Sequence, residues 1–352
     1  ERVVRRQGGR VVSGGGPVMV RQLRMRPGAE EYNRAVDLVR AKKYDEAKKY
    51  FEKVYLPIIK SEFPEILEKM AAGLAGEGSE CFGFDDEISK DHDFGPSCCI
   101  WLDNNDFEKY GLNLQKRLNE LPKEFMGFPV FCESEFGSNR RGVLNIDDWY
   151  YKFLNRADCP KDLYEWRLIP EKFLATATNG EVFLDNLGKF SKIRNELKNY
   201  FPEDIRLKKI AARCMKMAQS GQYNYYRCMR RGEIIAARLA ESEFISETIH
   251  MIFLLNKTYK PFYKWMAKKM KELPILGEKI YFLIEELIKL PTGALNRKGE
   301  IIEEISMSVI NELKRQSLVP RQIPSDFLQD YGPFVQQKIS DEKLRNLHPA
   351  SD

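Results

Sequence analysis

The sequence has 352 residues, which is enough for two or three domains. It is 43% hydrophobic and 31% charged, so it can form an ordinary globular core. This composition excludes a chain that is disordered because it has too few apolar residues. The net charge of +5 is small for this length and does not indicate a nucleic-acid binder. No apolar run approaches the length that spans a bilayer, so we expect no membrane partner.

The cysteine and histidine content indicates the cellular setting. Seven cysteines are an odd number, and no two have the Cys-x-x-Cys spacing. This pattern favours reduced thiols in a cytoplasm over a disulfide framework or a zinc site. Only three histidines occur, so we do not expect a histidine-rich metal site. The sequence therefore predicts a cytoplasmic protein.

The first 70 residues divide into two parts. Residues 1–28 are basic and rich in glycine, with no long apolar run, so we expect a disordered basic extension there. Residues 29–70 carry apolar side chains at the spacing of helices, with a possible turn at 41–43. We therefore predict an N-terminal helical pair over 29–70.

Residues 71–200 mix strand and helix patterns. Short β-prone runs at 97–102, 128–136 and 140–146 are separated by segments with helical spacing. A proline at position 122 ends one of these helical segments. This alternation predicts a small α/β sheet domain over 71–200.

The rest of the chain is predicted to be mostly helical. Residues 201–318 have apolar side chains three and four apart with few breakers, which predicts a helical bundle. Residues 319–352 are interpreted as an irregular C-terminal tail with a short closing helix. The expected fold class is therefore α+β, with a small mixed sheet, a C-terminal helical bundle and the N-terminal helical pair.

The stretch GEGSECFGFDDEISKDHDFG combines a glycine–serine turn with two carboxylates. Gly78 and Ser79 are followed, after eleven residues, by Asp91 and Asp93. Residues two apart on a strand point to the same face, so the two aspartates are expected to project together. Because two converging carboxylates repel each other, we expect a divalent cation between them, and the alternative is a solvated turn or a helix cap. Backbone N–H groups of the turn can bind a phosphate.

This combination resembles the signature of the nucleotidyltransferase superfamily, the group typified by DNA polymerase beta and the aminoglycoside nucleotidyltransferases. That signature is a hydrophobic residue, Gly-Ser, a short spacer and then acidic-x-acidic. The longer sequence around this motif, together with the segments QYNYYRCMRRGE and FLLNKTYKPFYKWM, is similar to an uncharacterised bacterial domain family within the superfamily. The similarity extends from about residue 30 to 320. The resemblance implies that the predicted sheet domain is a nucleotidyltransferase core.

The resemblance also implies a third carboxylate on a neighbouring strand, which would hold two Mg²⁺ ions together with the aspartate pair. Glu133 is the preferred candidate, because its strand follows the helix that usually precedes this residue. Asp147 is the alternative, and Glu135 is a weaker third. The glycine–serine turn would bind the triphosphate of a nucleoside triphosphate.

Cationic help for the triphosphate is expected from the helical bundle. Lys260 and Lys264 are four residues apart and have tyrosines beside them, and Arg227 begins an arginine cluster after an aromatic run. We expect Lys264 and Arg227 to contact the nucleotide. The alternative is a solvated basic helix face with aromatic core neighbours.

The expected activity is transfer of a nucleoside monophosphate from a nucleoside triphosphate to a hydroxyl or amine, with release of pyrophosphate. A small molecule is the first choice of acceptor and a protein side chain the second. The rival from another class is a non-catalytic module that keeps the fold and senses nucleotide. Nucleic acid is not expected as a partner, because the basic residues are scattered and the net charge is modest.

Overall fold

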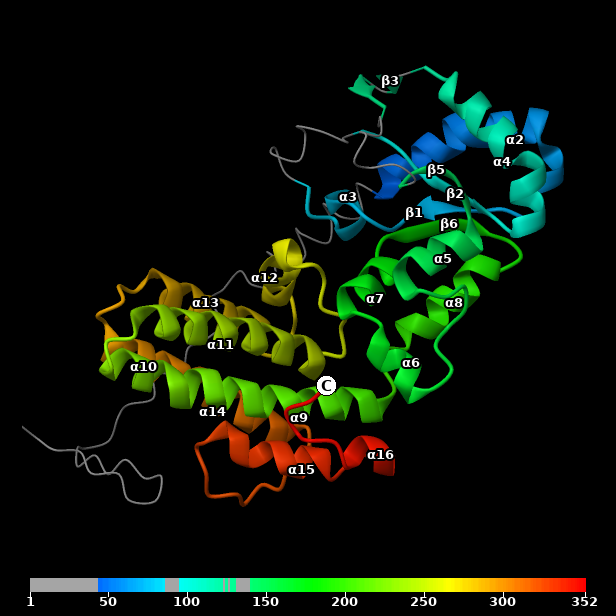
Figure 1. The fold of residues 1–352 in the computed structure, drawn as a ribbon. Helices are drawn as coiled ribbons and strands as arrows, with labels where there is room; N and C mark the ends of the chain where they lie inside the picture. The colour runs from blue at the N-terminus through cyan, green and yellow to red at the C-terminus, as the bar shows by residue number, and fades with distance from the viewer. Residues whose placement is uncertain (1–43, 86–94, 123, 126, 131–139) are drawn as a thin grey trace, which may run out of the picture. The chain divides into compact units, whose positions relative to one another are not determined.

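The computed structural model describes residues 44–85, 95–122, 124–125, 127–130 and 140–352 (Figure 1). All of these fall in the compact unit formed by residues 39–352. The predicted basic extension, 1–28, lies outside the described residues. None of the described helices is both long and apolar enough to cross a bilayer.

A four-stranded sheet has the strand order β5-β2-β1-β6. The strands are β1 (Ala71–Leu74), β2 (Cys99–Leu102), β5 (Gly142–Asn145) and β6 (Glu181–Asp185). β1 is antiparallel to both β2 and β6, whereas β2 and β5 are parallel. The prediction of a small mixed sheet is therefore confirmed. A separate two-stranded hairpin pairs β3 (Glu124–Phe125) with β4 (Phe128–Pro129).

Helices cover both faces of the sheet, which explains why every residue of β1 and β2 is buried. Alternate residues of β2 enter different cores, because side chains on a strand alternate between faces. Trp101 stacks on Phe190 at 4.0 Å, on the face covered by α5 (Ile146–Leu154), α7 (Glu171–Thr178) and α8 (Lys189–Lys198). Ile100 belongs to the opposite core.

The opposite core is formed by α4 (Asn104–Asn119) and the N-terminal helical segment. That segment runs from residue 44 through a π-helical stretch, η1 (Phe51–Tyr55), into α2 (Leu56–Glu62), and is followed by a 3-10 turn, η2 (Pro64–Ile66). The described part of the predicted helical pair is thus helical up to residue 66. The predicted turn at 41–43 lies outside the described residues.

The predicted bundle is also helical. After α6 (Leu163–Leu168), its elements are α9 (Glu203–Met217), η4 (Ala218–Tyr225), α10 (Tyr226–Arg230), α11 (Ile234–Leu255), α12 (Tyr263–Lys271), α13 (Gly277–Lys289) and α14 (Leu295–Arg315). Eleven of the fifteen residues of α9 are buried, so this helix forms the centre of the bundle. α11 packs against α9 and η4.

Residues 319–352 are more ordered than the expected irregular tail. They contain η5 (Leu328–Tyr331), α15 (Gly332–Gln336) and α16 (Glu342–Arg345), and all three pack on α9. Leu328, Tyr331 and Val335 are completely or almost completely buried there. The elements are too short for periodicity to reveal them, but their apolar side chains complete the surface of α9.

Candidate functional site

The turn that follows β1 has a backbone conformation that only glycine adopts easily. Gly78 has φ of +122° and ψ of 150°, and Gly76 has φ of +108°. A Cβ on Gly78 would lie 2.2 Å from a carboxylate oxygen of Glu80. Ser79 then begins the short helix α3 (Ser79–Phe82). The glycine–serine motif is therefore a tight connection between a buried strand and a helix.

The side-chain amide of Asn179 fixes the position of this turn. Asn179, which follows α7, accepts a hydrogen bond from the Gly76 N–H at 2.8 Å and donates one to the Gly76 carbonyl at 2.7 Å. Arg194 in turn donates to the carbonyls of Asn179 at 2.6 Å and Gly180 at 2.9 Å. The turn is thus positioned by hydrogen bonds from a distant part of the sequence.

A buried arginine borders the same turn. Arg141 donates to the Glu77 carbonyl at 3.0 Å and contacts Cys81 Sγ at 3.0 Å, and it forms an ion pair with Glu80. Burial works against its charge, but the ion pair with the Glu80 carboxylate opposes that cost, and the pKa of Arg141 is raised above its usual range. Arg141 therefore stays charged and puts fixed positive charge beside the turn. The sequence analysis did not single out this residue.

The turn lies at one defined end of the sheet. Gly73, next to the end of β1, pairs with Cys99, the first residue of β2. Cys99 also pairs with Gly142, the first residue of β5. β2 and β5 therefore both begin at the end of the sheet where β1 leads into the turn.

Three predicted metal ligands lie outside the described residues: Asp91, Asp93 and Glu133. The weaker candidate Glu135 does so as well. In the sequence, the aspartate pair shortly precedes β2, and Glu133 shortly precedes β5. No group of three or more potential metal ligands occurs among the residues that the structure describes.

The alternative third ligand, Asp147, lies at the other end of the sheet. It follows the last residue of β5, in the first turn of α5, and its Oδ2 accepts a hydrogen bond from Asn104 at 2.7 Å. Asn104 begins α4, directly after β2. The structure therefore does not bring Asp147 to the glycine–serine turn.

Helix α12 reaches the segment that follows α3. Lys268 donates a hydrogen bond to the Phe84 carbonyl at 3.1 Å, and the Trp265 ring packs against the Phe84 ring at 5.6 Å. Lys264 is exposed, lies over Trp265 at 4.9 Å, and is four residues before Lys268 on the same helix face. The predicted Lys264 thus lies on the helix that contacts the segment following α3. The structure adds Lys268, which the i, i+4 spacing from Lys264 could have revealed.

Arg227 is not part of this arrangement. It is exposed on α10, and its guanidinium lies over the Tyr223 ring at 4.6 Å. α10 packs against η4, α11 and α14. The contacts that join α12 to the turn therefore do not involve Arg227.

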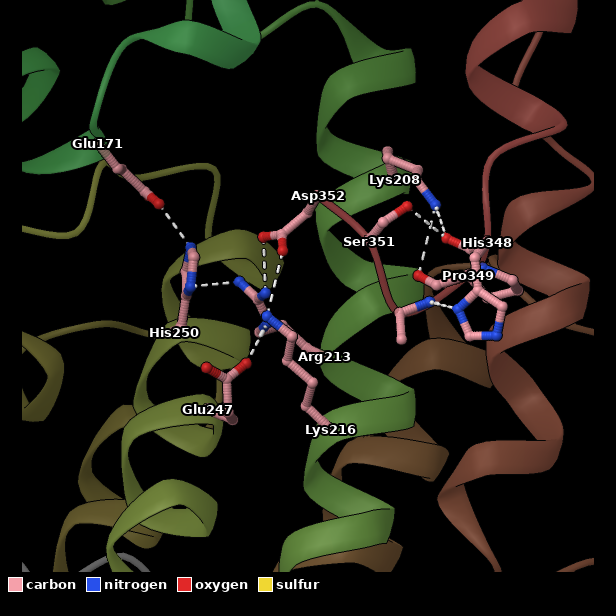
Figure 2. A network of polar contacts seen from close by, with 11 residues as sticks. Glu171, Lys208, Arg213, Lys216, Glu247, His250, His348, Pro349, Ser351 and Asp352 are labelled. Atoms are coloured by element: carbon pink, nitrogen blue, oxygen red, sulfur yellow. Dashed lines mark hydrogen bonds and ion pairs between the residues drawn. The ribbon is translucent and has the colours of Figure 1, made fainter.

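A buried polar network links α7, α11 and α9 (Figure 2). Glu171, the first residue of α7, accepts hydrogen bonds from the backbone N–H of Lys260 at 2.8 Å and from His250 Nε2 at 2.5 Å. His250 Nδ1 in turn lies 2.5 Å from Arg213, which forms ion pairs with Glu247 and Asp352. These contacts fix the neutral imidazole with its proton on Nε2, because Nδ1 must accept from a guanidinium.

Burial lowers the pKa of His250 to about 4, although the Glu171 carboxylate opposes this shift. The same network lowers the pKa of Glu171 despite its burial, through its contact with His250. At neutral pH the pair is therefore a carboxylate that accepts a hydrogen bond from a neutral imidazole. It joins α7, whose far end leads to Asn179, to α11.

Comparison with known proteins gives one match. Residues 166–266 match a family model described as "Domain of unknown function (DUF4037)". This range contains Glu171, Asn179, His250 and Lys264 but not the glycine–serine turn. No curated protein and no solved structure matches the chain. The chain is thus similar, over this range, to a family without an assigned function, and the superfamily relationship stays a prediction.

Proposed function

We propose that this protein is a metal-dependent nucleotidyltransferase. It transfers a nucleoside monophosphate from a nucleoside triphosphate to a hydroxyl or amine, on a small molecule in the first place or on a protein. The observation that supports this proposal is the turn at Gly78–Ser79, whose backbone at Gly78 has a conformation that only glycine adopts easily. The buried Arg141 borders this turn, and Lys268 of α12 contacts the segment that follows it.

Each described element has a role in this proposal. The N–H groups of the turn and the Ser79 hydroxyl bind the terminal phosphates of the nucleotide. Lys264 is exposed and has no carboxylate partner among the described residues, so it is available to a triphosphate. Lys268 holds α12 against Phe84 and so sets the distance between Lys264 and the turn.

The reaction forms a bond between the acceptor oxygen or nitrogen and the α-phosphorus and breaks the bond from that phosphorus to the bridging oxygen. Pyrophosphate leaves, and the acceptor proton passes to a base. The carboxylates of Asp91, Asp93 and Glu133 suit Mg²⁺, which binds few carboxylates together with phosphate oxygens. Two bound Mg²⁺ ions would supply charge stabilisation to the attacking and leaving oxygens.

A reducing, cytoplasmic setting is part of the proposal. Six cysteines within the described residues are free thiols. Burial raises the pKa of Cys81, Cys98 and Cys99, so these thiols stay protonated and serve packing.

The test combines turnover and binding. The protein is incubated with Mg²⁺, labelled nucleoside triphosphates and pools of small-molecule or protein acceptors, and pyrophosphate release is measured. We expect Asp91→Asn, Asp93→Asn and Glu133→Gln each to reduce release at least about a hundredfold. Asp147→Asn is the matched control and should leave it nearly unchanged, because Asp147 lies at the other end of the sheet.

Binding decides between the proposal and its rival. Calorimetric titration with a non-hydrolysable triphosphate should show a loss of affinity in Lys264→Met. Nucleotide binding without pyrophosphate, for every acceptor pool, would identify the non-catalytic sensor. Absence of both binding and release would refute the proposal and its rival together.

A further inference from the structure

The first two turns of α11 expose aliphatic side chains that a surface helix normally buries. Ile234 is 54% exposed, Ile235 80% and Leu239 68%. The second half of the helix is buried, from Thr248 to Leu255 without interruption. Residues 234–240 of α11 are all aliphatic or alanine except Arg238, and an apolar helix surface of this kind is normally covered. Its first half therefore presents an apolar face without a cover among the described residues.

Arginines without ion-pair partners among the described residues lie at the N-terminal end of this face, on α10 and in the turn before α11. Arg227, Arg230 and Arg231 are exposed, and none of them has a carboxylate partner within the described part of the chain. Arg238, also exposed, differs because it pairs with Glu241 at 2.7 Å. Three neighbouring guanidinium groups without a counter-charge are a feature of interfaces, where arginine is enriched.

A carboxylate without an ion-pair partner among the described residues lies further along the same face of α11. Glu243 is exposed and, in the described structure, forms no ion pair. It is four residues after Leu239, which is four residues after Ile235, so the three side chains lie along one stripe of the helix. The stripe thus consists of two aliphatic residues followed by an acid, and Arg231 lies in the turn that precedes α11. We call it the α11 stripe.

The α11 stripe is complementary to itself. If two copies of α11 lie antiparallel and cross at the level of Ala237, Ile235 of one copy faces Leu239 of the other, and Glu243 lies level with the turn that contains Arg231 of the other copy. The two-fold symmetry repeats each contact, as in an isologous dimer. Ala236 is exposed and small, so it permits a close approach of the two helices.

We propose that the α11 stripe is the docking site for a second copy of this chain. Two other partners fit less well. An acidic protein segment would pair with the arginines but leave Glu243 without a partner. A nucleic acid would do the same and would also leave Ile235 and Leu239 without an apolar counterpart. The proposal does not rest on the proposed enzymatic function.

Sedimentation equilibrium of the full chain over a range of concentrations tests the dimer. We expect a monomer–dimer equilibrium for the unchanged protein and an increase in the dimer Kd of about tenfold or more for Leu239→Asp. Leu112→Asp is the matched control, because Leu112 is 85% exposed on α4, away from the stripe, and should leave the Kd unchanged. Both positions are exposed, so circular dichroism should show folded proteins.

A charge exchange tests the register. Arg231→Glu and Glu243→Arg should each raise the dimer Kd about tenfold or more, because each variant places like charges opposite each other at both symmetry-related contacts of the dimer. The double variant carrying both changes restores opposite charges and should recover most of the affinity. A chain that stays monomeric throughout, or a dimer indifferent to Leu239→Asp, overturns the proposal. Monomeric protein that binds single-stranded RNA or an acidic peptide through these residues overturns it in favour of that partner.

Discussion

At the scale of single residues, Asn179 and His250 each use both of their side-chain polar atoms in hydrogen bonds. Asn179 uses both its amide oxygen and its amide nitrogen on Gly76. His250 uses both ring nitrogens, one on Glu171 and one on Arg213. Such residues act as fixed points, because replacing one of them leaves its partners buried without a hydrogen bond.

Gly78 tests the importance of the turn. In Gly78→Ala the new Cβ meets the Glu80 carboxylate, and φ of +122° with ψ of 150° is strained for any other residue. We expect the free energy of unfolding to fall by about 1–3 kcal/mol, and nucleotide affinity to be lost under the proposed function. Gly299→Ala, in the second turn of α14 with open space around the Cβ, should instead stabilise by about 0.5–1 kcal/mol. Urea denaturation measures both, and equal effects would contradict the argument.

His250 predicts how stability depends on pH. Its pKa is about 4 in the folded protein and 6.5 in an unfolded chain, so folding favours the neutral form. The stabilisation is complete above pH 6.5 and is lost as the pH falls towards 4, by on the order of 1–3 kcal/mol. Glu171 and Asp352 have lowered pKa values and add their own losses at still lower pH.

The measurement is the free energy of unfolding between pH 7.5 and 4.5. The decrease should be smaller in His250→Gln, whose amide does not titrate in this range. If both proteins lose stability in parallel, His250 is not the group responsible.

At the scale of secondary-structure elements, α7 connects the turn to the bundle. Its first residue, Glu171, accepts hydrogen bonds from His250 and from the backbone before α12. Asn179, directly after its last residue, holds Gly76. One rigid helix of eight residues thus sets the position of the turn relative to the base of α12.

Asn179→Ala tests this connection. The change leaves the N–H and carbonyl of Gly76 without their partner, so we expect a loss of about 1–3 kcal/mol in unfolding free energy. We also expect faster amide exchange at Gly76. Asn186→Ala removes an exposed hydrogen bond to Glu68 and should change stability by less than about 0.5 kcal/mol. Unchanged exchange at Gly76 in Asn179→Ala would show that the turn holds itself.

These elements also show which parts of the molecule the sequence could predict. The bundle and the sheet were predictable because their apolar residues repeat with the period of a helix or a strand. The turn was predictable from Gly78 and Ser79 themselves. Asn179 and Arg141 were not, because they contact the turn across 103 and 64 residues of sequence, and no local pattern records such a contact. Arg227 was assigned to the nucleotide from an arginine cluster that follows an aromatic run, and such a local pattern cannot show where α10 lies relative to the turn.

At the scale of the whole molecule, α9 is shared by the bundle and the C-terminal segment. Lys208 on α9 is almost completely buried and donates to the carbonyl of His348 at 2.7 Å (Figure 2). It also donates to Gln336 Oε1 at 3.1 Å. The amide of Gln336 donates in turn to the carbonyl of Arg345 at 2.7 Å. The segment is therefore bound to the centre of the bundle by polar contacts that α9 provides.

Lys208→Met follows from this shared position. The change removes a buried donor and leaves Gln336 Oε1 unpaired, so we expect a loss of about 2–4 kcal/mol in unfolding free energy. Lys343→Met, at an exposed position on α16, is the control and should be nearly neutral. Because α9 packs against α11, α15 and η5, the loss should appear in the main unfolding transition. Early proteolysis of residues 340–352 with an unchanged main transition would show instead that the segment folds independently of the bundle.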